Sequence, residues 1–133
     1  MFDHVDIHVQ DLEEAKRFYA TVLAPLGIEL SAAGDEYVEF GALSIGRRTP
    51  PTPPIHFAVI AETRDQVDAF HRAGVEAGYR DNGGPGIREY ADDYYAAYLL
   101  DPDGHNVEAV HRSEETRRRW PWLGRGLVAS TRD

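Results

Sequence analysis

The chain has 133 residues, of which 42% are hydrophobic and 28% are charged, and its formal net charge is −9 at pH 7. A chain of this length is expected to form one domain that buries about two-thirds of the surface exposed by the unfolded chain. The acidic charge argues against a nucleic-acid binder, which needs a basic face, and the absence of cysteine excludes disulfides, thiol nucleophiles and cysteine–zinc sites. No apolar run approaches the roughly 20 residues of a membrane span, and the first ten residues do not resemble a signal peptide, so we expect a cytoplasmic protein.

The first half of the chain predicts a strand, a helix and two further strands. Residues 4–9 alternate between polar and apolar side chains, which is typical of a strand. Asp11 is a suitable N-cap for a helix whose apolar residues recur at helical spacing and which ends at Pro25. Two short strands are predicted next, over residues 37–40 and 43–47, joined by a tight connection.

Residues 49–54 contain four prolines in six positions and predict a stiff, extended connector. After this connector the pattern of the first half begins again. The expected elements are a strand over 55–61, a helix over 64–77 with Val67, Phe70 and Val75 facing inward, a loop over 81–86, and strands over 94–100 and 106–111 joined by a turn over 101–104.

The second half therefore repeats the first. When His4 is superposed on His56, Phe18 falls on Phe70, and each half has a strand, a helix and further strands in the same order. The predicted fold class is α+β, with two tandem βαβββ modules. The module boundaries are about 1–48 and 55–112, and a separate tail covers 113–133.

Three side chains are candidate metal ligands by position. His4 opens the first strand of the first module, His56 opens the first strand of the second, and Glu108 lies in the last strand. If the modules pack around a pseudo-two-fold axis, these side chains converge. Two imidazoles and one carboxylate would hold Fe(II), Mn(II), Ni(II), Co(II) or Zn(II) and leave positions open for substrate. The alternative is two ordinary strand histidines and an exposed glutamate, since no local H-x-x-x-H motif is present.

Several segments resemble the vicinal oxygen chelate superfamily, which includes glyoxalase I, bleomycin-resistance proteins and extradiol dioxygenases. The similar segments are HVDIHVQDL at 4–12, FY at 18–19, LG at 26–27, IHFAV at 55–59 and DPDGHNVE at 101–108. The resemblance covers roughly residues 1–112 and implies one domain, whose two modules form a curved mixed sheet around a central cleft. It also implies that His4, His56 and Glu108 bind a divalent metal ion, and we expect a homodimer that acts on a small molecule.

Two departures from the family pattern narrow the expected chemistry. Glyoxalase I has a further carboxylate ligand, which acts as its base, at a position that the repeat places near Ser44; Glu39 belongs to the preceding strand. Extradiol dioxygenases are usually twice as long and carry a base histidine where this chain has Gly41. The resemblance therefore argues against glyoxalase I activity and leaves isomerase, lyase and ring-cleaving oxygenase reactions open, because one scaffold serves many reactions.

Candidate catalytic residues are Tyr98, Asp6 and His8. Tyr98 lies ten residues before Glu108, where the dioxygenases that this chain resembles place a substrate-facing tyrosine. Asp6 and His8 share the face of His4, because side chains two apart in a strand point the same way. Either could act as a base or orient an imidazole. The alternatives are a core tyrosine at Tyr98 and a solvent-facing His8.

Residues 81–90 are expected to form a mobile lip over the cavity. Arg88 on this lip, with Tyr94 and Tyr95 after it, would bind a carboxylate or an aromatic ring of the substrate; a solvated loop is the alternative.

A second possible function is a metal-free, drug-binding protein of the bleomycin-resistance type, because an acidic dimer with aromatic clefts suits a cationic ligand. We further expect His105 at the edge of its turn, His71 on the helix surface, and a short packed helix near Trp120 and Trp122 in the tail.

Overall fold

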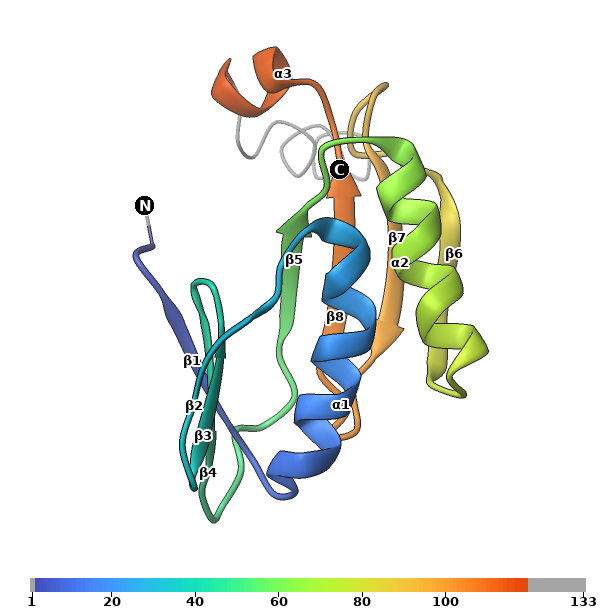
Figure 1. Ribbon diagram of the computed structural model, residues 1–133. Helices are drawn as coiled ribbons and strands as arrows, with labels where there is room; N and C mark the ends of the chain where they lie inside the picture. Colours follow the sequence, from blue (N-terminus) through green and yellow to red (C-terminus); the bar gives the residue numbers. More distant parts are fainter. Residues whose placement is uncertain (1, 120–133) are drawn as a thin grey trace.

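The computed structural model describes residues 2–119 (Figure 1). Its elements are β1 (Val5–Val9), α1 (Leu12–Leu23), the 3-10 turn η1 (Ala24–Leu26), β2 (Leu30–Ala33), β3 (Tyr37–Phe40), β4 (Leu43–Arg47), β5 (His56–Ile60), α2 (Arg64–Glu76), β6 (Arg80–Ile87), β7 (Tyr95–Leu100), β8 (Asn106–His111) and α3 (Glu114–Arg119). Each half has a strand, a helix and three strands, which confirms the predicted α+β fold of two βαβββ modules.

Each module forms a four-stranded mixed sheet, and the two sheets have equivalent strand orders, β1-β4-β3-β2 and β5-β8-β7-β6. In both, the first strand is parallel to the last, and the remaining pairs are antiparallel. Asp6 pairs with Ser44 in the first sheet, and Ala58 pairs with Glu108 in the second. Superposing His4 on His56 therefore places Ser44 at the position of Glu108, as the repeat predicts.

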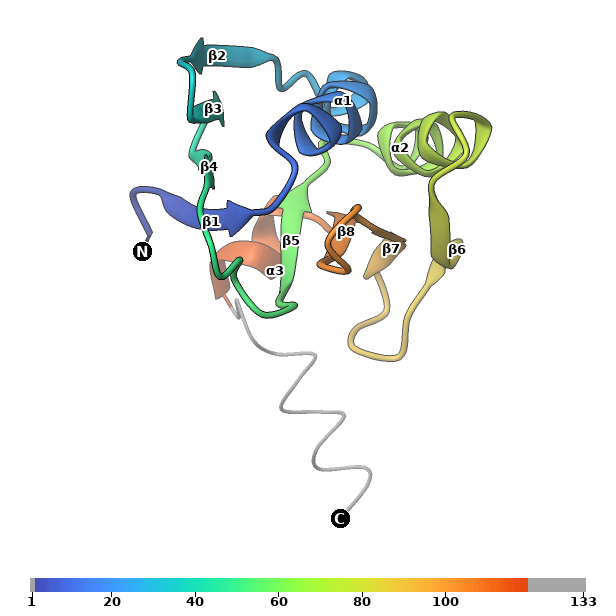
Figure 2. The ribbon, with the colours of Figure 1, turned by 90° about the horizontal axis from the view of Figure 1, so that it is seen from below.

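Helices α1 and α2 lie side by side and cover one face of each sheet, and the sheets remain two separate walls that do not close (Figure 2). The residues between the helices and the sheets form one hydrophobic core. Tyr19 of α1 connects the modules within this core, because its ring centroid lies 6.3 Å from that of Phe40 in β3 and 6.4 Å from that of Phe57 in β5. Since Ile7 and Val9 are buried in this core, their neighbours Asp6 and His8 project from the opposite face of β1.

Both long helices begin at a capping side chain. Asp11 accepts a hydrogen bond from the backbone N–H of Glu14 at 3.1 Å, as the sequence predicts, and Thr63 accepts one from Gln66 at 3.1 Å. Each bond satisfies a helix N–H that has no partner within the helix. At its other end α1 continues into η1, which ends at Gly27 with a left-handed φ of 76°.

Three expectations about the elements were wrong. The short strand β2 was not predicted. The predicted loop and lip are instead largely the strand β6, which pairs with β7 through two irregular register shifts. Val75, expected to face inward, is 45% exposed. The buried residue on that turn of α2 is Gly74, where a Cβ atom would lie 2.4 Å from Leu99 Cδ1.

The proline-rich connector has no regular structure and is attached to β1 through one residue. Thr52 donates its N–H to the His8 carbonyl at 2.9 Å, and its hydroxyl accepts the His8 N–H at 2.8 Å. These two bonds extend the edge of β1 with a short piece of connector and fix the path of the chain between the two modules.

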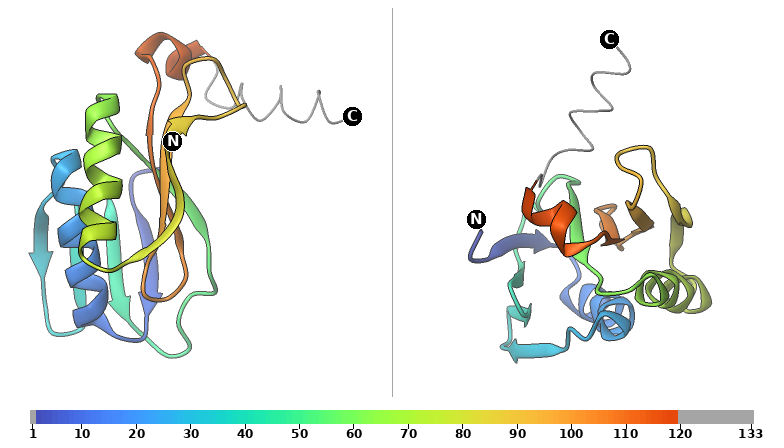
Figure 3. Two further views of the ribbon diagram at one scale, coloured as in Figure 1. Left: turned by 90° about the vertical axis from the view of Figure 1, so that its right-hand side faces the viewer. Right: turned by 90° about the horizontal axis from the view of Figure 1, so that it is seen from above.

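In the part of the tail that the structure describes, α3 lies at the same end of the second sheet as the β6–β7 connection (Figure 3). The Ser113 N–H donates to Asp93 Oδ2 at 2.8 Å and fixes the start of this helix. The predicted packing of Trp120 and Trp122 concerns residues outside the described range. Within residues 2–119, no helix combines the length and the apolar character required to cross a membrane.

Candidate functional site

The buried carboxylate of Glu108 is the centre of one group of predicted site residues. Its side chain is 2% exposed, and one oxygen, Oε1, lies 2.7 Å from His56 Nε2. The strands β5 and β8 are parallel neighbours, and His56 pairs with Asn106, two residues before Glu108. Both side chains therefore project from the face of the sheet that α2 leaves uncovered.

Two tyrosines surround this carboxylate. The Tyr94 hydroxyl donates to Glu108 Oε2 at 2.5 Å, so both carboxylate oxygens have a partner. Tyr98 pairs with Glu108 across β7 and β8, and its ring centroid is 6.0 Å from that of His56. Burial, followed by the charge of Glu108, raises the pKa of Tyr98 to about 12. Burial and the Glu108 hydrogen bond also raise the pKa of Tyr94, so both phenols are hydrogen-bond donors at neutral pH.

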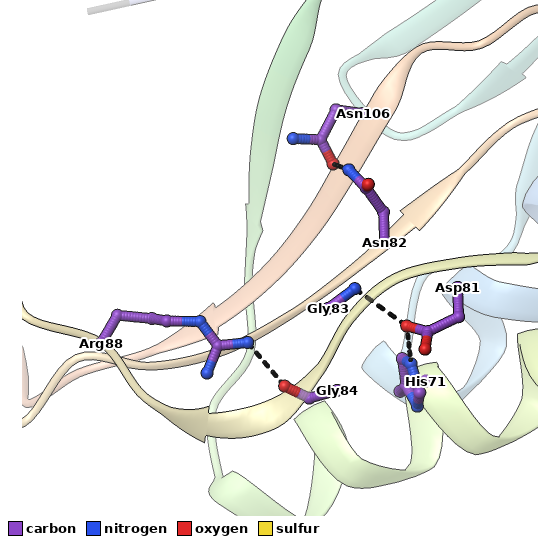
Figure 4. Close-up of polar contacts among 7 residues, drawn as sticks. All are labelled: His71, Asp81, Asn82, Gly83, Gly84, Arg88 and Asn106. Atoms are coloured by element: carbon purple, nitrogen blue, oxygen red, sulfur yellow. Dashed lines mark hydrogen bonds and ion pairs between the residues drawn. The ribbon is translucent and has the colours of Figure 1, made fainter.

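Arg88 completes this group, which we call the Glu108 cluster (His56, Arg88, Tyr94, Tyr98 and Glu108). Its guanidinium carbon lies 5.2 Å from the centre of the Tyr98 ring. Arg88 Nη2 donates to the Gly84 carbonyl at 2.5 Å (Figure 4). Beside the cluster, Arg112 lies over the Tyr94 ring at 5.5 Å. The cluster therefore combines a carboxylate, an imidazole, two phenols and a guanidinium, and a second guanidinium lies beside it.

Tyr95 does not belong to this cluster, although we expected it to bind substrate. Successive side chains of a strand point to opposite faces, and Tyr95 faces α2. There its hydroxyl donates to Asp68 Oδ1 at 2.6 Å, and Arg64 lies over its ring at 5.0 Å.

His4 lies in a different place, on the uncovered side of the first sheet. It lines a hollow of about 520 Å³, which we call the His4 hollow, together with Asp3, Asp6, Glu39, Gly41, Ala42 and Ser44. The His4 side chain is 67% exposed, and its Nδ1 lies 2.8 Å from Asp3 Oδ1. The hydrogen bond and charge of Asp3, with smaller effects of Asp6 and Glu39, raise the pKa of His4.

Two of the three carboxylates of this hollow lie on either side of Ser44. Asp6 pairs with Ser44 from β1, and Glu39 pairs with Ser44 from β3. The position equivalent to Glu108 is thus a serine between two acids. His8 lies farther along β1, where its Nε2 is 3.6 Å from Asp6 Oδ2.

One chain does not bring the three predicted metal ligands together. Among residues 2–119, no group of three His, Cys, Asp or Glu side chains could hold one metal ion. His56 and Glu108 provide a nitrogen and an oxygen donor in contact with each other, and this donor chemistry fits Fe(II), Mn(II), Ni(II), Co(II) or Zn(II). His4 lies in the separate hollow. His56 and Glu108 therefore form only part of a metal site, which needs a further ligand.

Sequence reasoning missed a buried polar group that supports His56. His105, expected at the edge of a turn, is fully buried, and its Nδ1 accepts the Ile55 N–H at 3.0 Å. Asp101 accepts the His105 N–H at 2.9 Å and the Tyr19 hydroxyl at 2.6 Å. These bonds fix the β7–β8 turn against the residue that precedes His56. The turn-forming sequence at residues 101–104 was the one feature of the sequence that could have pointed to this arrangement.

His71 is also less exposed than a surface position implies. Its side chain is 15% exposed, and its Nε2 lies 2.8 Å from Asp81 Oδ1, which also accepts the Gly83 N–H at 2.8 Å (Figure 4). Asn82 donates to Asn106 at 3.1 Å in the same region. Together these contacts attach β6 to α2 and to β8.

A family model and the solved structures of similar proteins point to the same superfamily. The family model described as the Glyoxalase/Bleomycin resistance protein/Dioxygenase superfamily matches residues 1–109. A crystal structure of a glyoxalase/bleomycin resistance protein from Albidiferax ferrireducens is 34% identical, with a TM-score of 0.71 over 84% of this chain and 98% of that chain. Oxidase ChaP-H2 is 26% identical, with a TM-score of 0.60 over 85% and 94% of the two chains.

A more distant structure, lactoylglutathione lyase from Agrobacterium tumefaciens, shares the fold. It is 19% identical, with a TM-score of 0.62 over 83% of this chain and 92% of that chain. A search of curated proteins returned no match.

Proposed function

Since the chain belongs to the glyoxalase/bleomycin resistance protein/dioxygenase superfamily, we propose that it is a divalent-metal-dependent enzyme acting on a small molecule with two neighbouring oxygens. The contact between His56 and Glu108 carries this proposal, because a buried carboxylate beside an imidazole on adjacent strands is a rigid pair of metal donors. Isomerase, lyase and ring-cleaving oxygenase reactions all fit this description, and the serine at position 44 argues against glyoxalase I chemistry.

The roles of the individual residues follow from their contacts. His56 and Glu108 would hold the ion, which when bound would supply Lewis-acid stabilisation of negative charge on substrate oxygens. Tyr94 orients the Glu108 carboxylate through its hydrogen bond. Tyr98 would donate a hydrogen bond to an oxyanion of the substrate, because its raised pKa keeps the phenol protonated at neutral pH, where no phenolate is available to act as a base.

We place the third ligand, His4, in a second copy of the chain. The His4 hollow and the Glu108 cluster lie on different sheets, on faces that α1 and α2 leave uncovered (Figure 2). A homodimer in which the first sheet of one copy covers the second sheet of the other would bring His4 to His56 and Glu108. It would also bring Asp6, with His8 beside it, to serve as the proton acceptor that Tyr98 is not.

Metal content tests the proposal. Untagged wild-type protein is expected to bind about one divalent ion per chain and to elute as a dimer, and His56→Ala is expected to lose the ion. His4→Ala should also lose affinity for the ion if the second copy completes the site. His111→Gln is a matched control at the end of the same sheet and should keep the ion. Well-folded wild type that binds no first-row ion would contradict the proposal.

The alternative is a metal-free small-molecule-binding protein of the bleomycin-resistance type. One observation favours it: the described part of a single chain offers an acidic hollow but no three-ligand group. Carboxylates and aromatic rings would suit a cationic drug. Stoichiometric binding of such a drug that a chelator leaves unchanged would favour this function over the metalloenzyme.

A further inference from the structure

Arg88, a member of the Glu108 cluster, is held by contacts with the backbone and with the Tyr98 ring. Its backbone N–H donates to the Tyr94 carbonyl at 2.8 Å, and its Nη2 donates to the Gly84 carbonyl at 2.5 Å. Among residues 2–119, Arg88 makes no ion pair with a carboxylate. The Arg88 side chain also hydrogen-bonds to Tyr98. A guanidinium has five N–H donors, so donors remain for a ligand.

The glycines of β6 make room for this arrangement. A Cβ atom on Gly83 would lie 2.9 Å from Tyr98 Cδ2 and 3.4 Å from Arg88 Nη2, and a Cβ atom on Gly86 would lie 3.1 Å from Arg88 Nη1. A larger residue at either position would displace the ring or the guanidinium. The glycine-rich sequence that suggested a loop therefore seats Arg88 and Tyr98 against the backbone of a strand.

Tyr98 lies between this cation and the proposed metal donors. Its ring is 5.2 Å from the Arg88 guanidinium carbon and 6.0 Å from the His56 ring, and it pairs with Glu108 across the sheet. A planar molecule lying along Tyr98 would have the donors at one end and the guanidinium at the other.

We propose that Arg88 binds a carboxylate of the substrate, and that the substrate class is therefore a small aromatic acid whose two neighbouring oxygens lie at His56 and Glu108. This inference rests on the proposed function and adds the charge and shape of the ligand. A guanidinium binds a carboxylate through two parallel hydrogen bonds, which an ammonium group does not reproduce. The Arg88 guanidinium lies over the face of the Tyr98 ring, and the edge of that ring offers an edge-to-face contact to an aromatic ring of the ligand.

The experiment compares two diols that differ only in the carboxylate. Binding of 3,4-dihydroxybenzoate and of catechol is measured by calorimetry in the presence of Zn²⁺, which has no redox chemistry. Wild type is expected to bind 3,4-dihydroxybenzoate about tenfold or more tightly than catechol, because charge-assisted hydrogen bonds are strong. Arg88→Gln should reduce this ratio to about one, because it removes the partner of the carboxylate, and Arg88→Lys should restore part of it.

Arg80→Gln is the matched control, because it removes the same charge from an exposed position at the other end of β6. It should keep the wild-type ratio. Equal ratios in wild type and Arg88→Gln would overturn the inference, as would wild type that binds neither diol.

Zinc stoichiometry on the same samples separates this inference from the proposed function. Wild type that binds no zinc, yet prefers the acid in a manner that Arg88→Gln abolishes, would support the carboxylate site while the metal proposal fails. One zinc per chain with no preference for the acid would overturn the carboxylate site and leave the metal proposal standing.

Discussion

The two modules share one backbone plan, and their uncovered faces carry different chemistry. In the first sheet the row of paired residues is Asp6, Ser44 and Glu39; in the second, the equivalent row is Ala58, Glu108 and Tyr98. The central residue is a neutral serine between two acids in one module and a buried carboxylate beside a phenol in the other. A repeated fold therefore fixes the positions, whereas the residues at those positions decide which half holds preorganised donors.

The difference follows from the cost of burying charge. A carboxylate as buried as Glu108 needs hydrogen-bond partners, and His56 and Tyr94 engage its two oxygens. In the first module the acids on either side of Ser44 are not fully buried, so their charges remain accessible to solvent. In the function proposed above, the second module would supply the rigid pair of donors, and the first module of another copy would complete the site.

The largest expected effect comes from making the second module resemble the first. Glu108→Ser removes the carboxylate donor and should weaken divalent-ion binding by at least about 100-fold, beyond the loss caused by residues that only orient a ligand. Isothermal titration with Mn²⁺ or Zn²⁺ measures the change. Ser44→Ala, the matched change in the first module, should leave affinity within a few-fold. Equal losses in the two variants would remove the distinction between the modules.

Two adjacent tyrosines give the next test. Tyr94→Phe removes the hydrogen bond to Glu108 Oε2 and is expected to reduce metal affinity by about 10- to 100-fold, as other groups that orient ligands do. Tyr95→Phe removes a hydrogen bond of similar length, 2.6 Å, to Asp68 on the opposite face and should leave metal affinity unchanged. Parallel titrations of the two variants provide the measurement. Similar affinities for both would mean that Tyr94 does not support the site.

Much of the fold could be predicted because alternation and repetition are local signals. The strands Tyr37–Phe40, Leu43–Arg47 and Asn106–His111 were predicted with the bounds observed. In β2 only one of four residues is even partly buried, so no alternation marks that strand. In β6 the glycines that make room for Arg88 and Tyr98 are also the residues that predict a loop, so this strand was predicted as a loop.

The site was predictable only where one sheet determines it. The repeat drew attention to His56, and the place of Glu108 in the last strand, with the family resemblance, drew attention to Glu108; the two residues lie on adjacent strands of the second sheet. The separation of His4 from them depends on how α1 and α2 pack between the sheets, and no strand pattern contains that information. Tyr94 and Tyr95 contact opposite faces of the second sheet. Which of the two contacts Glu108 depends on the strand register, because a shift of one residue exchanges the faces to which side chains point.

A smaller effect is expected where the two modules are joined. The Tyr19 hydroxyl of α1 donates to Asp101 of the second module, and Asp101 is 3% exposed. Tyr19→Phe leaves a buried carboxylate oxygen without this donor and should lower the free energy of unfolding by about 1–3 kcal/mol. Urea denaturation measures the change. Tyr37→Phe, at a 43% exposed position, should change stability by less than about 0.5 kcal/mol, and an equal effect of the two would contradict a joint role for Tyr19.

The smallest effect concerns the contact that attaches β6 to α2. The hydrogen bond from His71, with that from the Gly83 N–H, lowers the pKa of Asp81 below its ordinary value of 3.8. Because the folded-state pKa is the lower one, the carboxylate contributes stability above about pH 4 and loses it as the pH falls through the folded value. The urea midpoint of wild type should therefore exceed that of Asp81→Asn at about pH 5, and the difference should shrink below about pH 4. Asp35→Asn, an exposed change in the first module, controls for net charge. A difference between wild type and Asp81→Asn that does not vary with pH would show that the ionisation of Asp81 does not contribute to stability. The contact with His71 would then not explain any loss of stability of the second module at low pH.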